Sequence, residues 1–93
     1  MIKSFSCKET EEIFGRQFAK KCPLDIQRLA YRKLVLLDSA ERLGDLRMPP
    51  GNCLEKLSGN RHGQYSIRTN DQWRLCFKWQ ASDAYEVEIA DYH

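Results

Sequence analysis

The second half of the chain contains side chains that could together perform acid–base chemistry on a phosphate. Glu55 has a carboxylate, and alternation along two neighbouring strands would place Arg68 and Arg74 on one face. The last three positions add a carboxylate, a phenol and an imidazole, from Asp91, Tyr92 and His93. Carboxylates and imidazoles act as general bases and acids, and an arginine fork stabilises charge that develops on a phosphate. Such a set could cleave RNA without a metal ion.

RNA cleavage would need three separate contributions from these groups. The 2′-hydroxyl must lose a proton so that its oxygen can attack the adjacent phosphate, and the 5′-oxygen must gain a proton as it leaves. The phosphorane-like transition state gathers negative charge, which arginines stabilise. Tyr92 could stack on a base or hold the attacking hydroxyl.

Each of these residues also has an ordinary structural explanation. A histidine at a chain end is usually frayed and inert, and a carboxylate such as Glu55 is usually one partner of a surface ion pair. Arg74 would then be an exposed strand residue. The aromatic series favours a core over a nucleic-acid stacking platform, and its members are Trp73, Phe77, Trp79 and Tyr85. Residue types and spacing alone lead to a small α+β domain with an anion-binding face as one interpretation.

Charge is unevenly distributed although the formal net charge of the 93 residues is only +2. Positions 56–78 carry one acid, Asp71, and five bases: Lys56, Arg61, Arg68, Arg74 and Lys78. Positions 79–93 carry acids and no lysine or arginine. A local positive surface is compatible with a polyanion partner, but scattered charge on a solvated sheet face is the more common explanation.

Several classes of protein are excluded or disfavoured by the sequence. The length fits one domain over 1–93, and no apolar run approaches the ~20 residues that span a bilayer. The first residues lack the apolar stretch of a signal peptide, so we expect a cytoplasmic location. Nucleotide-binding loops and metal-ligand spacing are absent, so we expect no cofactor and no metal. The four cysteines are expected to be free thiols: Cys7, Cys22, Cys53 and Cys76.

The first half of the chain has the pattern of two helices preceded by a short strand. Alternation predicts a strand over residues 2–5. Ser6 and Glu9 have capping-box spacing, which predicts a helix over residues 7–19. Pro23 can occupy the first turn of a second helix, whose apolar residues recur at three- and four-residue steps over 24–43. Residues 49–52, Pro-Pro-Gly-Asn, predict a loop.

The second half changes to a period of two. Strands are predicted over 54–57, 64–69, 73–79 and 84–90. The third of these would bury its aromatic side, whereas the other side would expose Arg74 and Lys78 beside Ser66 and Arg68. In the last strand Tyr85, with Val87 and Ile89, would point inward. This is an antiparallel meander of three to four strands, and with helices on one face it makes a two-layer α+β domain.

Four strings found in order along the chain carry a family resemblance. They are MIKSFSC at the start, LRMPPGNCLE in the middle, LSGNRHGQYSIRTNDQWRLCF after it, and VEIADYH at the end. Together they closely resemble the HigB toxins of the RelE/ParE superfamily of bacterial type II toxin–antitoxin systems, including the GraT-like branch. The resemblance covers essentially the whole chain.

The resemblance implies a fold, an activity and partners. It implies a RelE-like (microbial RNase-like) fold and a metal-independent endoribonuclease, an mRNA interferase that cuts translated mRNA in the ribosomal A site. It also implies neutralisation by a HigA-type helix-turn-helix antitoxin, and binding of operator DNA only through the antitoxin complex.

The resemblance further assigns roles to individual positions. The terminal DYH string matches the positions that the family needs for cleavage, and Arg74 matches the arginine that stabilises the scissile phosphate. Glu55 stands where some HigB proteins have a histidine, so either Glu55 is the general base or the base lies elsewhere. The RNA- or ribosome-binding positions would be Lys56, Arg61, Arg68 and Lys78.

Two other functions remain open from the sequence. A ParE-like toxin of the same superfamily would inhibit DNA gyrase without cutting RNA, and a shared fold does not separate the two. The DYH string and the Arg68/Arg74 pair favour a nuclease. A plain nucleic-acid-binding module would show salt-sensitive binding without strand cleavage.

Overall fold

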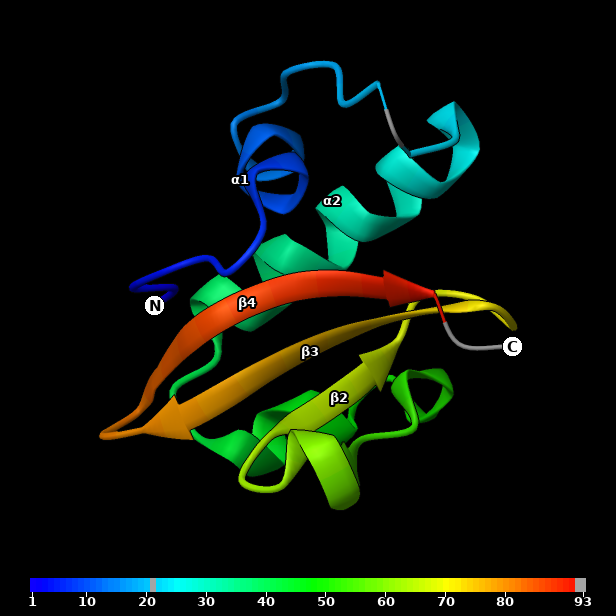
Figure 1. Cartoon of the computed structure of the whole chain (residues 1–93). Helices are drawn as coiled ribbons and strands as arrows, with labels where there is room; N and C mark the ends of the chain where they lie inside the picture. The colour runs from blue at the N-terminus through cyan, green and yellow to red at the C-terminus, as the bar shows by residue number, and fades with distance from the viewer. Residues whose placement is uncertain (21, 92–93) are drawn as a thin grey trace.

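The chain folds into two layers, with helices on one face of an antiparallel sheet (Figure 1). The structure is a computed structural model and describes residues 1–20 and 22–91. The helices are α1 (Lys8–Phe14) and α2 (Leu24–Ser39). Four strands follow, and they neighbour one another in sequence order: β1 (Glu55–Lys56), β2 (Tyr65–Arg68), β3 (Trp73–Gln80) and β4 (Asp83–Asp91). The predicted two-layer α+β architecture is confirmed.

Three short 3₁₀ turns follow α2, two of them before β1 and the third between β1 and β2. They are η1 (Leu43–Arg47), η2 (Pro50–Asn52) and η3 (Gly59–Arg61). η1 and η2 pack against each other, and η2 also packs against β2. The segment predicted as a loop over 49–52 is therefore a structured turn at the edge of the sheet.

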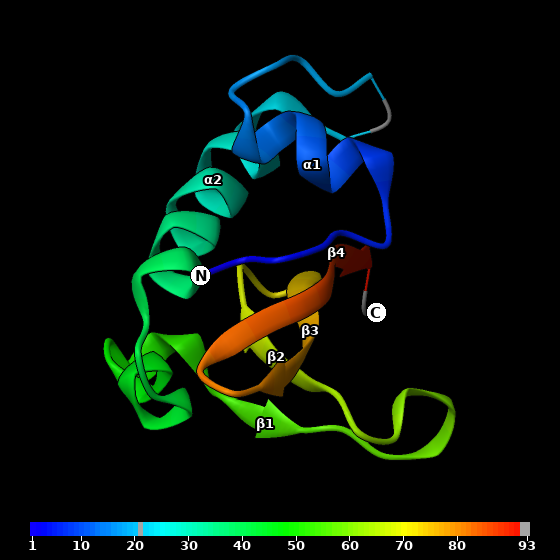
Figure 2. The same cartoon turned by 90° about the vertical axis from the view of Figure 1, so that its left-hand side faces the viewer.

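Alternation along β3 divides the sheet into a core face and an outer face. Leu75 and Phe77 are fully buried, and α2 packs across β3 and β4 on their side. Arg74 and Lys78 take the outer face. Figure 2 shows both helices on the same side of the strands. The predicted inward and outward sides of this strand are confirmed.

The predicted N-terminal strand over 2–5 is wrong. This segment runs beside β4 but makes only two isolated parallel bridges, Ile2 with Ala84 and Phe5 with Val87. Between these bridges the Ser4 side chain accepts the amide of Glu86 at 2.8 Å. Glu86 lies at a bulge in β4, so no continuous ladder forms there.

The first helix is shorter than predicted, and its predicted capping box is absent. The N-cap is Cys7, whose Sγ donates to Glu9 Oε2 at 3.1 Å, while Ser6 Oγ donates to a carbonyl of β4. The helix ends because Arg16 adopts a left-handed backbone (φ 61°), and the amide of Gln17 then reaches back to the carbonyl of Glu12. This is a Schellman ending with arginine in the usual place of glycine.

The second helix also stops early, at Ser39 and not at residue 43. Ala40 is extended and buried, so the chain leaves the helical path there. The Asp45 carboxylate then accepts the amides of Glu41 and Arg42 at 3.1 and 3.0 Å. These bonds satisfy donors that a longer helix would have used.

The predicted inward orientation of Tyr85 is wrong. The register pairs Tyr85 with Lys78, so both lie on the outer face. The bulge places an extra residue, Glu86 with φ 52°, on the β4 side of the pair that would oppose Phe77. One extra residue reverses the side of every residue beyond it. Val87, on the other side of the bulge, stays buried as predicted.

Candidate functional site

Arg74 is held by several contacts on the outer face. Its side chain is 13% exposed. Nε donates to Ser66 Oγ at 2.8 Å, and Nη2 donates to the carbonyl of Cys53 at 2.5 Å. Glu55 Oε2 lies 3.9 Å from Nη2, and the Glu55 side chain is 60% exposed. The guanidinium is thus held by a strand neighbour and a turn, with one carboxylate beside it.

Ser66 was predicted to be exposed, and this is wrong. It is completely buried. The reason is that Ser66 lies directly opposite both Glu55 and Cys76, and the Arg74 side chain covers its hydroxyl. Ser66 therefore positions Arg74 from beneath.

Arg68 lies directly opposite Arg74 in the β2–β3 register. Two like charges in a cross-strand pair normally destabilise a sheet. The acid bonded to Arg68 is Asp71, whose side chain is 97% exposed and therefore well screened by water. The pair thus leaves a positive potential over this end of the outer face, where a phosphate can bind.

Asp91 ends β4, and the register places it on the other face of the sheet from these arginines. It lies opposite Trp73, next to the position that faces Arg74, and Gln72 Nε2 donates to its Oδ2 at 3.1 Å. The other two predicted catalytic residues, Tyr92 and His93, lie outside the described residues.

Three predicted RNA-binding residues lie away from Arg74, on β1, in η3 and further along β3. Lys56 is exposed on β1. Arg61 Nη1 forms an ion pair with Glu88 at 2.6 Å, and Lys78 Nζ forms one with Glu86 at 2.6 Å. Lys78 lies four residues from Arg74 along β3, which is about 13 Å of strand. The structure therefore groups Glu55, Arg68 and Arg74 on the outer face, and it does not bring Lys78 to them.

Comparison with known proteins decides the family. A model of the family described as "RelE-like toxin of type II toxin-antitoxin system HigB" matches residues 3–93. This chain belongs to the HigB-like toxin family. It is 34% identical to "Endoribonuclease HigB" of Proteus vulgaris, over 94 residues that cover all of both proteins. It is 51% identical to "Toxin HigB-1" of Vibrio cholerae over 57 residues.

The extent of these matches differs between relatives. The Vibrio match covers 61% of this HigB-like chain and 60% of that relative's own length. A solved structure, the YoeB–YefM complex from Staphylococcus aureus, aligns with all of this chain and 98% of its own with a TM-score of 0.60. At 21% identity the structural match shows the fold alone, and it agrees with the RelE-like fold that the resemblance implied.

Sequence reasoning missed part of the site of this HigB-like toxin. The carbonyl of Cys53 holds Arg74, and the preceding residue, the fully buried Asn52, accepts a hydrogen bond from Lys33 of α2. The prediction of a loop over residues 49–52 gave no reason to expect a buried asparagine there. Lys33 belongs to a different element, α2, so only tertiary structure connects it with the site.

The thiols of Cys7, Cys22 and Cys53 in this HigB-like toxin are free, as predicted. Burial raises the pKa of the Cys22 thiol, and the charges of Asp25 and Cys7 raise it further. Cys53 is exposed beside the site, whereas Cys76 is buried.

Within residues 1–20 and 22–91, no group of three His, Cys, Asp or Glu side chains could hold a metal ion. No helix in the same ranges is long and apolar enough to cross a membrane.

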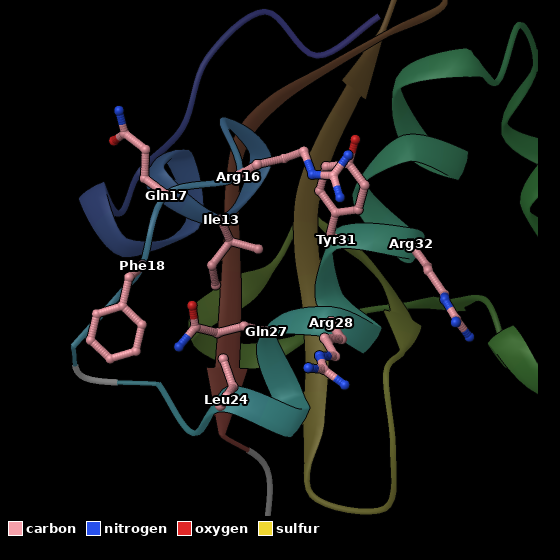
Figure 3. Close-up of a pocket in the computed structure, with 9 residues that line it drawn as sticks. All are labelled: Ile13, Arg16, Gln17, Phe18, Leu24, Gln27, Arg28, Tyr31 and Arg32. Atoms are coloured by element: carbon pink, nitrogen blue, oxygen red, sulfur yellow. The ribbon is translucent and has the colours of Figure 1, made fainter.

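A groove lies on the helical layer, apart from the arginine pair. It has a volume of about 560 Å³ and is formed by α1, α2 and the segment that joins them (Figure 3). Its apolar residues include Phe18 and Leu24, which are 65% and 58% exposed. Three arginines also line it: Arg16, Arg28 and Arg32. This second surface therefore combines exposed apolar area with positive charge.

Proposed function

We propose that this HigB-like toxin is an endoribonuclease that cleaves translated mRNA in the ribosomal A site. The observation that carries the proposal is the fixed Arg74 guanidinium, paired with Arg68 and flanked by Glu55, at the sheet end where β4 leads into the DYH string. The Proteus relative that matches over its whole length is named an endoribonuclease, which supports the same activity.

The proposed chemistry assigns each group one task. Glu55, or a group in the terminal string, accepts the proton of the 2′-hydroxyl, whose oxygen attacks the adjacent phosphate. Arg74 stabilises the charge of the phosphorane-like transition state. His93 returns a proton to the leaving 5′-oxygen, and Tyr92 orients the nucleotide. These side chains supply base, acid and charge stabilisation, so the proposed reaction needs no metal ion.

Ribosome dependence follows from the openness of the proposed site. Glu55 is largely exposed and Arg68 is partly exposed, so the chain encloses little of a flexible RNA. A ribosome would hold the mRNA in a reactive geometry, which otherwise carries a large entropic cost. Ribosomes also place the activity in the cytoplasm.

The proposed partners follow from membership of a toxin–antitoxin family. A HigA-type helix-turn-helix antitoxin would neutralise the toxin. The toxin–antitoxin complex would bind operator DNA through the antitoxin, and the toxin itself would contact the ribosome and mRNA through basic residues such as Lys56 and Arg61.

Primer extension on a defined mRNA in a purified translation system tests the activity. We expect wild-type toxin to cut only when ribosomes are present, at codons in the A site. The Tyr92→Ala/His93→Ala variant should leave the mRNA intact in the same reactions. Intact mRNA with wild-type toxin, together with inhibition of DNA gyrase, would contradict the proposal in favour of a ParE-like activity.

A further inference from the structure

A single turn holds two cations that come from different elements. The carbonyl of Cys53 accepts a hydrogen bond from Arg74 of β3, and the side chain of Asn52 accepts one from Lys33 of α2. Because these two acceptors are consecutive in the chain, the turn brings the middle of α2 and the start of β3 to the same edge of the sheet.

The buried Asn52 side chain has only one way to satisfy its hydrogen bonds. Its Nδ2 donates to the carbonyls of Leu46 and Met48, at 3.1 and 3.2 Å. Both donors of the amide are therefore used within η1 and its C-cap, and Oδ1 must face Lys33 Nζ. Because Asn52 is fully buried and its Oδ1 accepts the Lys33 hydrogen bond, it fixes the position of that lysine.

Lys33 is half-buried, and the turn that holds it also holds Arg74, the cross-strand neighbour of Arg68. Burial lowers the pKa of its ammonium, and the positive charge of Arg68 lowers it further. Its hydrogen-bond partner is a neutral amide. Two cations that repel each other at a fixed position are the arrangement that a bound anion stabilises.

We propose that Lys33 and Arg68 form a phosphate subsite, which binds the RNA phosphodiester next to the one held by Arg74. Arg68 is the cross-strand neighbour of Arg74, so an RNA backbone that crosses this pair presents successive phosphates to the two positions. The identity of the ligand as RNA rests on the proposed function. Asn52 is a positioning residue, because it acts through Lys33.

RNA binding without cleavage measures this subsite directly. The probe is a fluorescent six-nucleotide RNA with 2′-O-methyl sugars, titrated with the free toxin at a series of salt concentrations. A single-stranded phosphate contact contributes about 0.7 to the slope of log K against log salt. We expect Lys33→Met to lower this slope by about 0.7, and Lys33→Arg to restore it. Lys8→Met, an exposed lysine on α1, should leave it unchanged.

The outcomes separate the subsite from the catalytic proposal. An unchanged slope and affinity in Lys33→Met would overturn the subsite even if the wild type cleaves mRNA. Failure of the wild type to bind the RNA at the lowest salt would also overturn it. If Lys33→Met lowers the slope of log K against log salt but the wild type never cuts mRNA, the result would support the subsite and contradict the endoribonuclease activity.

The groove on the helical layer supports a second inference from separate observations. Phe18 and Leu24 are largely exposed there, and an apolar surface that includes an aliphatic side chain favours a protein partner, whose apolar side chains can bury both residues. Arg16 lies over the Tyr31 ring, 5.0 Å from its centroid (Figure 3). Among the described residues that line the groove, none is acidic.

We infer that this groove binds an amphipathic, acidic helix of the antitoxin. The apolar face of such a helix would cover Phe18 and Leu24, and its carboxylates would pair with Arg28 and Arg32. The inference rests on membership of a toxin–antitoxin family and does not depend on the RNA chemistry.

Titration with the antitoxin encoded beside the toxin gene tests the groove. We expect Phe18→Ser/Leu24→Ser, and separately Arg28→Glu, to raise the Kd at least 10-fold. Met48→Ser removes an equally exposed apolar side chain outside the groove and should bind as the wild type does. Wild-type affinity in the groove variants would overturn the inference. Loss of ribosome binding with antitoxin binding intact would instead make the groove an rRNA surface.

Discussion

Replacement of Arg74 by methionine should lower ribosome-dependent mRNA cleavage by about 100-fold to 1,000-fold, the usual cost of removing one donor to a developing oxyanion. The guanidinium is already oriented by Ser66 and by the carbonyl of Cys53, so it stabilises the transition state without reorganising. Single-turnover cleavage rates on stalled ribosomes would measure the effect.

A lysine at position 74 separates charge from geometry. Arg74→Lys keeps the charge but cannot reach Ser66 and Cys53 with the same planar fork, so we expect it to recover only a small part of the rate. Arg47→Met, an exposed arginine in η1, is the matched control and should cleave as the wild type does. Wild-type rates in Arg74→Met would show that Arg74 is a structural strand residue.

The strand pattern could be predicted from sequence because it depends on local alternation. In β3 each apolar side chain meets the same layer, so Leu75 and Phe77 had to lie on one side. In β4 the same argument failed at Tyr85, because the bulge at Glu86 reverses the alternation. Nothing in the residues 84–90 marks Glu86 as the one with a left-handed backbone, since glycine is absent there.

The predicted ends of both helices were wrong for a similar reason. The apolar period of α2 continues beyond Ser39, but the competing bonds from Asp45 are made by a segment whose position depends on the fold. In α1, the left-handed residue is an arginine, so the usual glycine signal for the end of a helix is missing.

The candidate site was predictable only in part. Residue type and register were sufficient to place Arg68 opposite Arg74, because both follow from the strand pattern. The turn that holds Arg74 and Lys33 was not, since it joins elements about 20 to 40 residues apart through one backbone carbonyl and one buried amide. Ion pairs also changed the interpretation of the basic segment: Arg61 and Lys78 are each bonded to an acid of β4, which sequence reasoning had treated as a separate acidic stretch.

The second large effect that we expect is on stability, from Phe77→Ala. Phe77 is completely buried at the centre of β3, where its ring lies 6.3 Å from that of Tyr65 and 6.4 Å from that of Trp79. Truncation of a buried phenylalanine costs about 3–5 kcal/mol, from lost transfer free energy and the cavity that remains. A domain of this size has about 5–15 kcal/mol in total, so the variant should lose a large share of its free energy of unfolding.

Urea unfolding followed by tryptophan fluorescence would measure this loss, because Trp79 contacts Phe77. Phe18→Ala is the matched control: it removes the same atoms from a largely exposed side chain in the groove, and its effect should stay within about 0.5 kcal/mol. Equal effects of the two variants would mean that the core is not organised around β3.

The packing of Phe77 matters for function as well, because Arg74 is three residues from Phe77 on the same strand. A strand fixed by its buried side holds the guanidinium still on the other, and Phe77→Ala should therefore slow cleavage even at temperatures where it remains folded.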